Sequence, residues 1–319
     1  MTTGEVGMLS QVVGLAQAVG LPYETKTVHS RAPWRWLPGH WAAKLGVLSG
    51  LDPKDGICPP WPDLLITCGR RSVAVALAIK RASRGHTFTV HIQDPRVPPG
   101  CFDMVVPPEH DGLTGPNVYP SKGALHKLTR ETLNTAAEHF RQSFAAVRKP
   151  FVAVLIGGKS KAYDLTPSRM RELATQFKSL ITDQGAGMVI TTSRRTGAEN
   201  ETILRETLAG TDAIVWDGTG ENPYLAMLAL ADIIIVTEDS ASMVSEACFT
   251  GKPAYVAKLE GGSKRFNALH RSLEEAGFTR PFTGNLETWN YKPLDENQRI
   301  ATIVRGQLAR HLAAGSGNT

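Results

Sequence analysis

Residues 233–257 read Ile-Ile-Ile-Val-Thr-Glu-Asp-Ser-Ala-Ser-Met-Val-Ser-Glu-Ala-Cys-Phe-Thr-Gly-Lys-Pro-Ala-Tyr-Val-Ala. The apolar run 233–236 is typical of a strand buried in a parallel sheet. Polar residues that favour helix N-caps follow at 237–242, a helical pattern covers 243–249, and Gly251 ends it. The stretch therefore predicts a strand–helix–strand unit with small hydroxyl side chains at the start of its helix.

The start of this helix could bind an anionic ligand. Asp239, Ser240, Ser242 and Met243 lie where the N-terminal N–H groups of the helix point outward, and such groups attract phosphate. Glu246 follows one turn later, where its carboxylate can accept hydrogen bonds from a sugar diol. The alternative is an ordinary capped helix with a glutamate on its surface.

Strand and helix patterns alternate along the whole chain. In the first half we expect strands at 22–28, 63–68, 87–92 and 103–106, and helices at 12–19, 73–81 and 129–147. In the second half we expect strands at 151–156, 187–192 and 213–216, and helices at 166–181, 199–208, 223–230 and 296–312. This alternation predicts an α/β protein: two Rossmann-like parallel-sheet domains facing across a cleft at the carboxyl ends of their strands.

The domain boundary is expected at Pro150, which halts a helix directly before a new strand. We therefore expect an N-terminal Rossmann-like domain over 1–148 and a C-terminal nucleotide-binding domain over 149–290. A helix over 291–314 and a disordered tail over 315–319 complete the chain.

Two further turns of the second half could bind phosphate, because each follows an expected strand. One offers glycine amides and a lysine, the other a hydroxyl and two guanidiniums: Gly157, Gly158 and Lys159, then Ser193, Arg194 and Arg195. Asn222 and Tyr224 stand at a helix start on the same edge and could face a base, or they serve only as a structural cap. Three such turns on one sheet edge favour a nucleoside diphosphate.

Composition excludes several classes of function. The net charge is +5, but the chain contains no dense Lys/Arg stripe and no aromatic stacking motif. We therefore do not expect nucleic-acid binding. The four cysteines are scattered, and no metal-carboxylate cluster is present, so we expect no metal site and no disulfide framework. Without a membrane-length apolar run or a signal peptide, we expect a cytoplasmic protein that at most lies on the surface of the inner membrane.

A tryptophan-rich stretch bears on that membrane contact. Residues 31–41 combine three tryptophans with Arg and His, a composition that suits a headgroup layer or a lipid-linked acceptor. The alternative is a loop packed on its own domain.

Short segments along nearly the whole chain, in the same order, resemble the mitochondrial-fission Elm family. They include Gln-Asp-Pro-Arg at 93–96 and Thr-Thr-Ser-Arg-Arg-Thr at 191–196, together with 2–7, Gln11, 68–71, 108–111, 155–158, 222–224 and 239–246. The last segment is also similar to the nucleotide-binding segment of GT-B glycosyltransferases. That resemblance implies a Ser-rich turn that receives the diphosphate of a UDP-type nucleotide-sugar donor, and a helical Glu246 that binds its ribose.

The resemblance also implies roles for the first half. Transfer of a sugar to a hydroxyl needs a base, for which His110, Asp111 and Asp94 are the candidates, although a histidine in a loop is more often a surface residue. An envelope or lipid-linked acceptor would be bound by Gly4, Gly7, Gln11, Gly69, Arg70, Arg71 and Arg96. The alternative reading of 69–72 is a solvated capped helix. Many relatives carry a His after the first glycine segment, where this chain has Met8, so the obvious base is missing.

Two structural expectations come from the same resemblance. The C-terminal helix should pack back toward the N-terminal domain. Members of the fold begin with a strand before the first glycine segment, but here that segment follows Met1 almost directly. We expect either a start assigned downstream of the true one or a sheet without its central strand.

We therefore predict a glycosyltransferase that needs neither a metal nor a cofactor. The motifs Gly-x-Gly-x-x-Gly and Tyr-x-x-x-Lys of NAD-dependent epimerases are absent, and on that ground we do not expect an epimerase. The alternative is a non-catalytic adaptor of the Elm family that binds a dynamin-like partner or a membrane surface. An adaptor would have little need of the phosphate-binding side chains.

Overall fold

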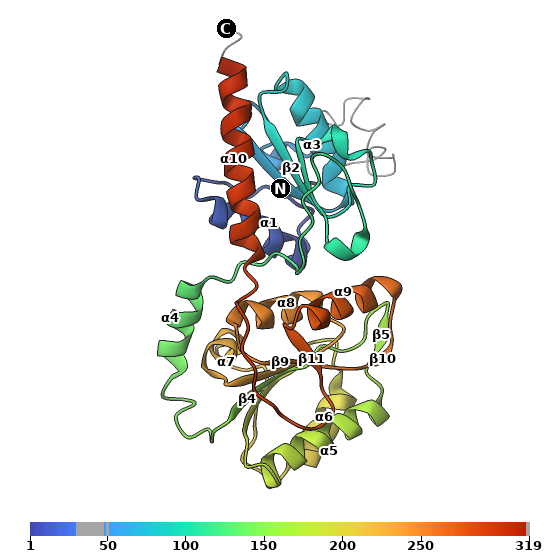
Figure 1. Ribbon diagram of the computed structural model, residues 1–319, viewed down its shortest axis with the longest axis vertical. Coiled ribbons are helices and arrows are strands. Elements are labelled where there is room, and N and C mark those ends of the chain that lie inside the picture. The colour runs from blue at the N-terminus through green and yellow to red at the C-terminus, as the bar shows by residue number, and fades with distance from the viewer. Residues whose placement is uncertain (30–47, 49–50, 317–319) are drawn as a thin grey trace. The chain divides into compact units, whose positions relative to one another are not determined.

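The computed structural model describes residues 1–29, 48 and 51–316 and divides into two compact units (Figure 1). The first unit combines Met1–Lys127 with the C-terminal segment from Asp295, and the second unit is Leu128–Leu294. The boundary therefore lies after Lys127 and not at Pro150. The reason is that α4 (Arg130–Phe140) packs against α7 (Tyr224–Leu230) of the second unit.

The sheet of the first unit is parallel, with the order β1-β2-β3 in the described residues. The strands are β1 (Leu64–Cys68), β2 (Phe88–Ile92) and β3 (Met104–Val106). Helix α3 (Arg70–Ala82) covers one face, and α1 (Val6–Val19) and α10 (Glu296–Ser316) cover the other. Short 3-10 turns occur at Pro53–Asp55, Pro99–Cys101 and Glu109–Asp111.

Alternation along β1 explains this two-sided burial. Leu65 packs with α3, whereas Ile66 packs with α1 and α10, because successive side chains of a strand point to opposite faces. Helix α10 also packs along α1. It continues through Ser316, so the first residues of the expected tail are helical.

The N-terminal residues differ from the expected strands. The Met1 amino group donates to the Ile66 carbonyl oxygen (2.7 Å), and the Cys68 amide donates to the Met1 carbonyl oxygen (3.3 Å). On the other side, Thr2 forms an isolated parallel bridge with Thr27, and this bridge is all that forms of the strand expected at 22–28. Met1 and Thr2 thus pair on both sides, with β1 on one side and with the segment around Thr27 on the other.

Six strands form the sheet of the second unit within the described part of the chain, in the order β11-β9-β8-β4-β6-β7 and all parallel. They are β4 (Phe151–Leu155), β6 (Gly187–Thr191), β7 (Ile214–Val215), β8 (Ile233–Thr237), β9 (Ala254–Ala257) and β11 (Thr279–Pro281). The chain adds β6 and β7 on one side of β4 and then crosses to β8 on the other side. The topological switch point of this sheet therefore lies between the carboxyl ends of β4 and β8.

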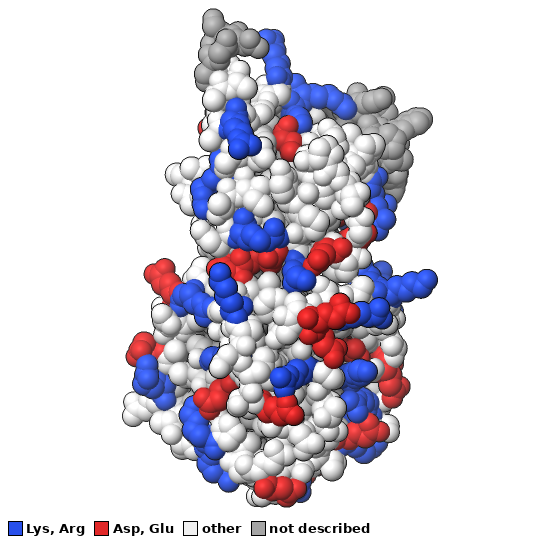
Figure 2. Space-filling view, in the orientation of Figure 1, with Lys and Arg blue, Asp and Glu red and all other residues white. Residues whose placement is uncertain are grey.

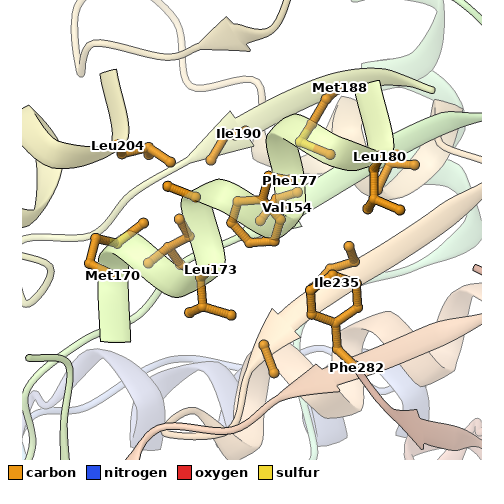
Figure 3. Close-up of a cluster of buried hydrophobic side chains, with 14 of the residues drawn as sticks. Val154, Met170, Leu173, Phe177, Leu180, Met188, Ile190, Leu204, Ile235 and Phe282 are labelled. Atoms are coloured by element: carbon orange, nitrogen blue, oxygen red, sulfur yellow. The ribbon is translucent and has the colours of Figure 1, made fainter. Parts of the chain in front are cut away.

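Helices cover both faces of this sheet (Figure 1). Helices α5 (Pro167–Thr182) and α6 (Ala198–Leu208) pack on one face, with Phe177 fully buried at the centre of the cluster in Figure 3. Helices α4, α7, α8 (Ala241–Thr250) and α9 (Lys264–Glu275) pack on the other. A short antiparallel pair, β5 (Tyr163–Asp164) with β10 (Glu260–Gly261), extends the carboxyl edge.

Some boundaries differ from those expected. Helix α1 begins at Val6, so Gly7 is helical and does not lie in a loop. Helix α4 ends at Phe140, and turns replace the helix expected up to 147. None of the helices in the described ranges is both long enough and apolar enough to cross a membrane. The tryptophan-rich stretch 31–41 lies outside the described residues.

Candidate functional site

Helix α8 begins at the carboxyl end of β8, beside the switch point. Ser240 is its N-cap: its backbone is extended, and its Oγ accepts the N–H of Met243 (3.3 Å). The N–H groups of Ala241 and Ser242 belong to the first turn, where the helix itself supplies no acceptor. These positions are only partly buried, so the start of α8 can bind an anion.

Glu246 lies one turn further along α8, next to Tyr224 at the start of α7. The Tyr224 hydroxyl donates a hydrogen bond to the Glu246 carboxylate. Burial, followed by the nearby Glu246 charge, raises the pKa of Tyr224 well above its usual value, so the phenol keeps its proton. The exposed Asn222 accepts the Tyr224 N–H through its side-chain oxygen (2.9 Å). The three residues predicted to face a ribose and base thus lie together.

The glycine turn after β4 is paired within the protein. The Gly157 N–H donates to Thr237 Oγ1 (2.7 Å), and the Gly158 N–H donates to Asp239 Oδ2 (3.1 Å). Both amides that we expected to face a phosphate therefore have protein acceptors. Lys159 is exposed and forms an ion pair with Asp164 (3.2 Å).

The turn after β6 is joined to the glycine turn. Ser193 Oγ and Thr196 Oγ1 both donate to the Gly157 carbonyl oxygen, at 2.8 and 2.5 Å. Arg195 forms an ion pair of 2.7 Å with the buried Asp239 carboxylate, and both Arg194 and Arg195 are exposed to solvent. The structure therefore brings the predicted phosphate-binding turns together but engages Arg195 internally.

Close backbone approach explains both glycines. A Cβ atom at Gly157 would lie 2.2 Å from an Asp239 carboxylate oxygen. At Gly158, where φ is +147°, a Cβ atom would lie 2.1 Å from the Arg195 carbonyl oxygen. No larger residue fits either position without a shift of the neighbouring turn.

Sequence reasoning missed Thr237 and Thr196, whose hydroxyls join the turns. The only signal in the sequence is the residue type, a threonine. Each of the two follows or ends near an apolar run and lies beside a predicted site residue. Their partners lie about 40 or more positions away along the chain, at Gly157, and no local pattern reveals such a pair.

In the first unit, the starts of α1 and α3 meet beyond the carboxyl end of β1. Gly69 caps α3 with φ +91°, and a Cβ atom there would lie 2.5 Å from Met8 Sδ. Gln11 contacts the Cys68 thiol through Oε1 (3.9 Å). The side chain that replaces the expected histidine, Met8, therefore packs on the α3 cap.

Two guanidiniums at the start of α3 are solvent-accessible. Arg70 and Arg71 are exposed in the first turn of α3. The Thr3 hydroxyl, and to a smaller extent the Arg71 charge, lowers the pKa of the Glu5 carboxyl. Gly4 adopts φ +91° beside Thr27, in the turn that leads into α1. The candidates Gly4, Gly7, Gln11, Gly69, Arg70 and Arg71 thus gather around two helix starts.

The acid/base candidates follow β2 and β3. Asp94 forms an ion pair with Arg96 (3.1 Å), and Gln93 and Arg96 both have positive φ, at 81° and 57°. Non-glycine residues rarely adopt such angles outside functional or strongly constrained segments.

His110 and Asp111 lie in the 3-10 turn Glu109–Asp111. His110 Nε2 is 3.8 Å from the Asp111 carboxylate, and each side chain is only 9% exposed. This separation is an ion-pair distance and is too long for a hydrogen bond. No group of three or more potential metal ligands occurs among the residues that the structure covers.

Comparison with known proteins identifies the family. The family model described as mitochondrial fission ELM1 matches residues 6–308. The chain belongs to the mitochondrial fission ELM1 family. A mitochondrial fission protein ELM1 of Arabidopsis thaliana is 34% identical over 292 residues, which cover 80% of this chain and 65% of that relative. The chain thus spans less than two thirds of that relative's length.

Another relative of this ELM1-family chain is the uncharacterized protein RP120 of Rickettsia prowazekii. The two are 30% identical over 289 residues, which cover 76% of this chain and 79% of the relative.

Solved structures show the fold of the ELM1-family chain. UDP-GlcNAc 2-epimerase from Methanocaldococcus jannaschii, in complex with UDP-GlcNAc and UDP, has a TM-score of 0.51 and 14% identity, covering 93% of this chain and 96% of that chain. MurG of Acinetobacter baumannii has a TM-score of 0.51 and 13% identity, covering 98% and 92%. The predicted α/β architecture of GT-B type with two Rossmann-like units is therefore confirmed.

The structural neighbours also bear on the expectation that the chain is not an epimerase. We did not expect an epimerase, because the motifs of NAD-dependent epimerases are absent from the chain. Proteins named as UDP-GlcNAc 2-epimerases share the fold of this ELM1-family chain. The expectation drawn from the missing motifs therefore concerns NAD-dependent epimerases only.

Proposed function

We propose that this ELM1-family chain is a metal-independent glycosyltransferase that binds a UDP-type nucleotide sugar in its second unit. The observation that carries this proposal is the position of α8. Its N-terminus follows β8 at the switch point between β4 and β8, the place where doubly wound sheets bind ligands, and Glu246 with its partner Tyr224 lies one turn further along α8.

We propose a role for each part of the site. The first-turn amides of Ala241 and Ser242, with the Ser240 hydroxyl at the cap, bind the diphosphate. The Glu246 carboxylate accepts the ribose hydroxyls, and the Tyr224 ring borders the base. On the face shown in Figure 2, acidic and basic side chains are interspersed over the second unit without a broad patch of one sign.

The first unit supplies the acceptor side of the proposal. The exposed Arg70 and Arg71 attract an acidic group, such as that of an envelope or lipid-linked acceptor. Asp94, or His110 assisted by Asp111, takes the proton of the acceptor hydroxyl. With such an acceptor, we propose that the protein acts in the cytoplasm, in peripheral contact with the inner membrane.

A non-catalytic adaptor is the competing function. A relative's name refers to mitochondrial fission, and an adaptor would bind a dynamin-like partner or a membrane surface through the same scaffold. Such a protein needs no nucleotide site. Nucleotide binding therefore discriminates between the two functions.

UDP is expected to stabilise the protein without added metal. At about 100 times its dissociation constant, UDP should stabilise the fold by ~2.7 kcal/mol. The measurement is a thermal unfolding scan of the full chain in EDTA, with uridine as the control that lacks phosphates. An unchanged melting temperature with UDP, GDP, CMP, ADP and their sugar conjugates would leave the adaptor as the better reading.

Replacement of Glu246 by alanine is expected to weaken UDP binding. A hydrogen bond to a charged group contributes about 1.5–3 kcal/mol, so the dissociation constant should rise by roughly one to two orders of magnitude. Isothermal titration of UDP measures the change. Tyr224→Phe is the matched control, because it removes the same intramolecular hydrogen bond but keeps the carboxylate. If Tyr224→Phe weakens binding as much as Glu246→Ala, the tyrosine hydroxyl contacts the ligand or orders the site, and the ribose role of Glu246 fails.

A further inference from the structure

Asp239 contacts two groups that the sequence predicts to bind phosphate, the glycine turn after β4 and Arg195. Its carboxylate is fully enclosed, although its neighbour Ser240 is only partly buried. It accepts hydrogen bonds from the Gly158 N–H (3.1 Å) and from Thr237 Oγ1 (2.7 Å). These are the kinds of contact that glycine turns make to phosphate oxygens.

The same carboxylate holds Arg195. The ion pair is 2.7 Å long, and the Arg195 side chain stays 42% exposed. A partly exposed guanidinium can exchange one anion for another, because it remains hydrated during the change. A phosphate that approached Arg195 would compete with Asp239 for the guanidinium. The negative charge of the Asp239 carboxylate would also repel it.

We propose that Asp239 is a specificity-determining residue that substitutes for a phosphate and limits how much negative charge the site accepts. The inference rests on the proposed nucleotide site and adds to it a discriminating group. The inference implies that the diphosphate binds mainly at the start of α8, because the Asp239 carboxylate already occupies the glycine turn and Arg195. Neutralising Asp239 should then release Arg195 for the ligand.

Isothermal titration with pyrophosphate and with UDP tests this inference on the full chain. Asp239→Asn keeps the shape and an acceptor oxygen for Gly158 but removes the charge. It should bind pyrophosphate and UDP about tenfold more tightly than the parent, a change equivalent to ~1.4 kcal/mol. The matched control is Asp183→Asn, which changes the net charge equally at the exposed C-cap of α5, the far end of that helix. It should leave both affinities unchanged.

A double substitution separates the charge effect from a packing effect. The gain depends on Arg195, so Asp239→Asn with Arg195→Gln should return to within about threefold of the parent. If Asp239→Asn binds no more tightly than the parent, or if the double variant keeps the whole gain, the inference is overturned. If Asp239→Asn loses its cooperative melting transition, Asp239→Ser removes the same charge with a smaller side chain, and the same affinities decide.

The outcomes distinguish the inference from the proposed function. Tight UDP binding by the parent without a gain in Asp239→Asn contradicts the inference and leaves the function intact. If Asp239→Asn binds pyrophosphate more tightly than the parent does, but no variant binds UDP more tightly than pyrophosphate, the inference is supported and a nucleotide site is contradicted. If neither compound binds the parent or the variants, both fail.

Discussion

Phe177→Ala is expected to lower the free energy of unfolding of the second unit by about 3–5 kcal/mol. The Phe177 side chain is fully buried in α5, where it lies between the helix and the sheet (Figure 3). Its ring centroid is 5.8 Å from that of Phe282. Alanine would remove these contacts and leave a cavity that the surrounding strands cannot fill.

Native-state hydrogen exchange is the appropriate measurement for this substitution, because the two units need not unfold together. The slowest amides of β4 and β6 should lose protection, and those of β1 and β2 in the first unit should not. Thr175→Ala, on the exposed face of the same helix, is the control and should change stability by less than about 0.5 kcal/mol. A loss at Phe177 as small as that of the control would mean that the cavity collapses.

Gly158→Ala is expected to have a comparable effect and also to impair ligand binding. An alanine at φ +147° is strained by about 1–3 kcal/mol, and the clash of its Cβ with the Arg195 carbonyl oxygen adds about 1–3 kcal/mol more. The neighbouring turn must shift, and with it the Asp239–Arg195 pair at the site.

The control for this change is Gly185→Ala. Gly185 also has positive φ (+70°), but a Cβ there would meet no atom within 4 Å. It should cost only the left-handed backbone strain, about 1–2 kcal/mol, and leave UDP affinity unchanged. Urea unfolding and UDP titration of both variants check the comparison. Equal losses in the two variants would show that the tight contact of the β4 and β6 turns is unimportant.

The sequence reveals most of the second unit because its strands are buried on both faces. Residues 151–156 are continuously apolar, and 187–192 contain the apolar run 188–190; the structure places β4 and β6 within one residue of the strands expected there. Helix α9 escaped notice because only Leu269 and Leu273 are buried among its twelve residues, so its apolar pattern is sparse. The isolated bridge at Thr27 shows the opposite case, in which a strand-like composition finds only one backbone partner.

The site was partly predictable for a similar reason. The capped start of α8 and the position of Glu246 are encoded within eight consecutive residues, so local pattern suffices. The side chains that bind the amides of the glycine turn are distant in sequence: Gly157 and Gly158 pair with residues about 80 positions later. Composition cannot show whether an amide faces a ligand or a side chain that the fold brings to it.

The division of the chain also sets an order of events during synthesis. The second unit is continuous in sequence, whereas the first unit is completed only by the segment from Asp295. Ile300 and Val304 of α10 pack in one cluster with Leu15 of α1 and Val90 of β2. The residues of α1 and β2 are translated first, but α10 is translated last. The apolar face that α10 covers therefore stays uncovered on the nascent chain throughout translation of the second unit. The half that is translated later can finish folding earlier, and the exposed face of the first half is where a nascent-chain chaperone would be needed.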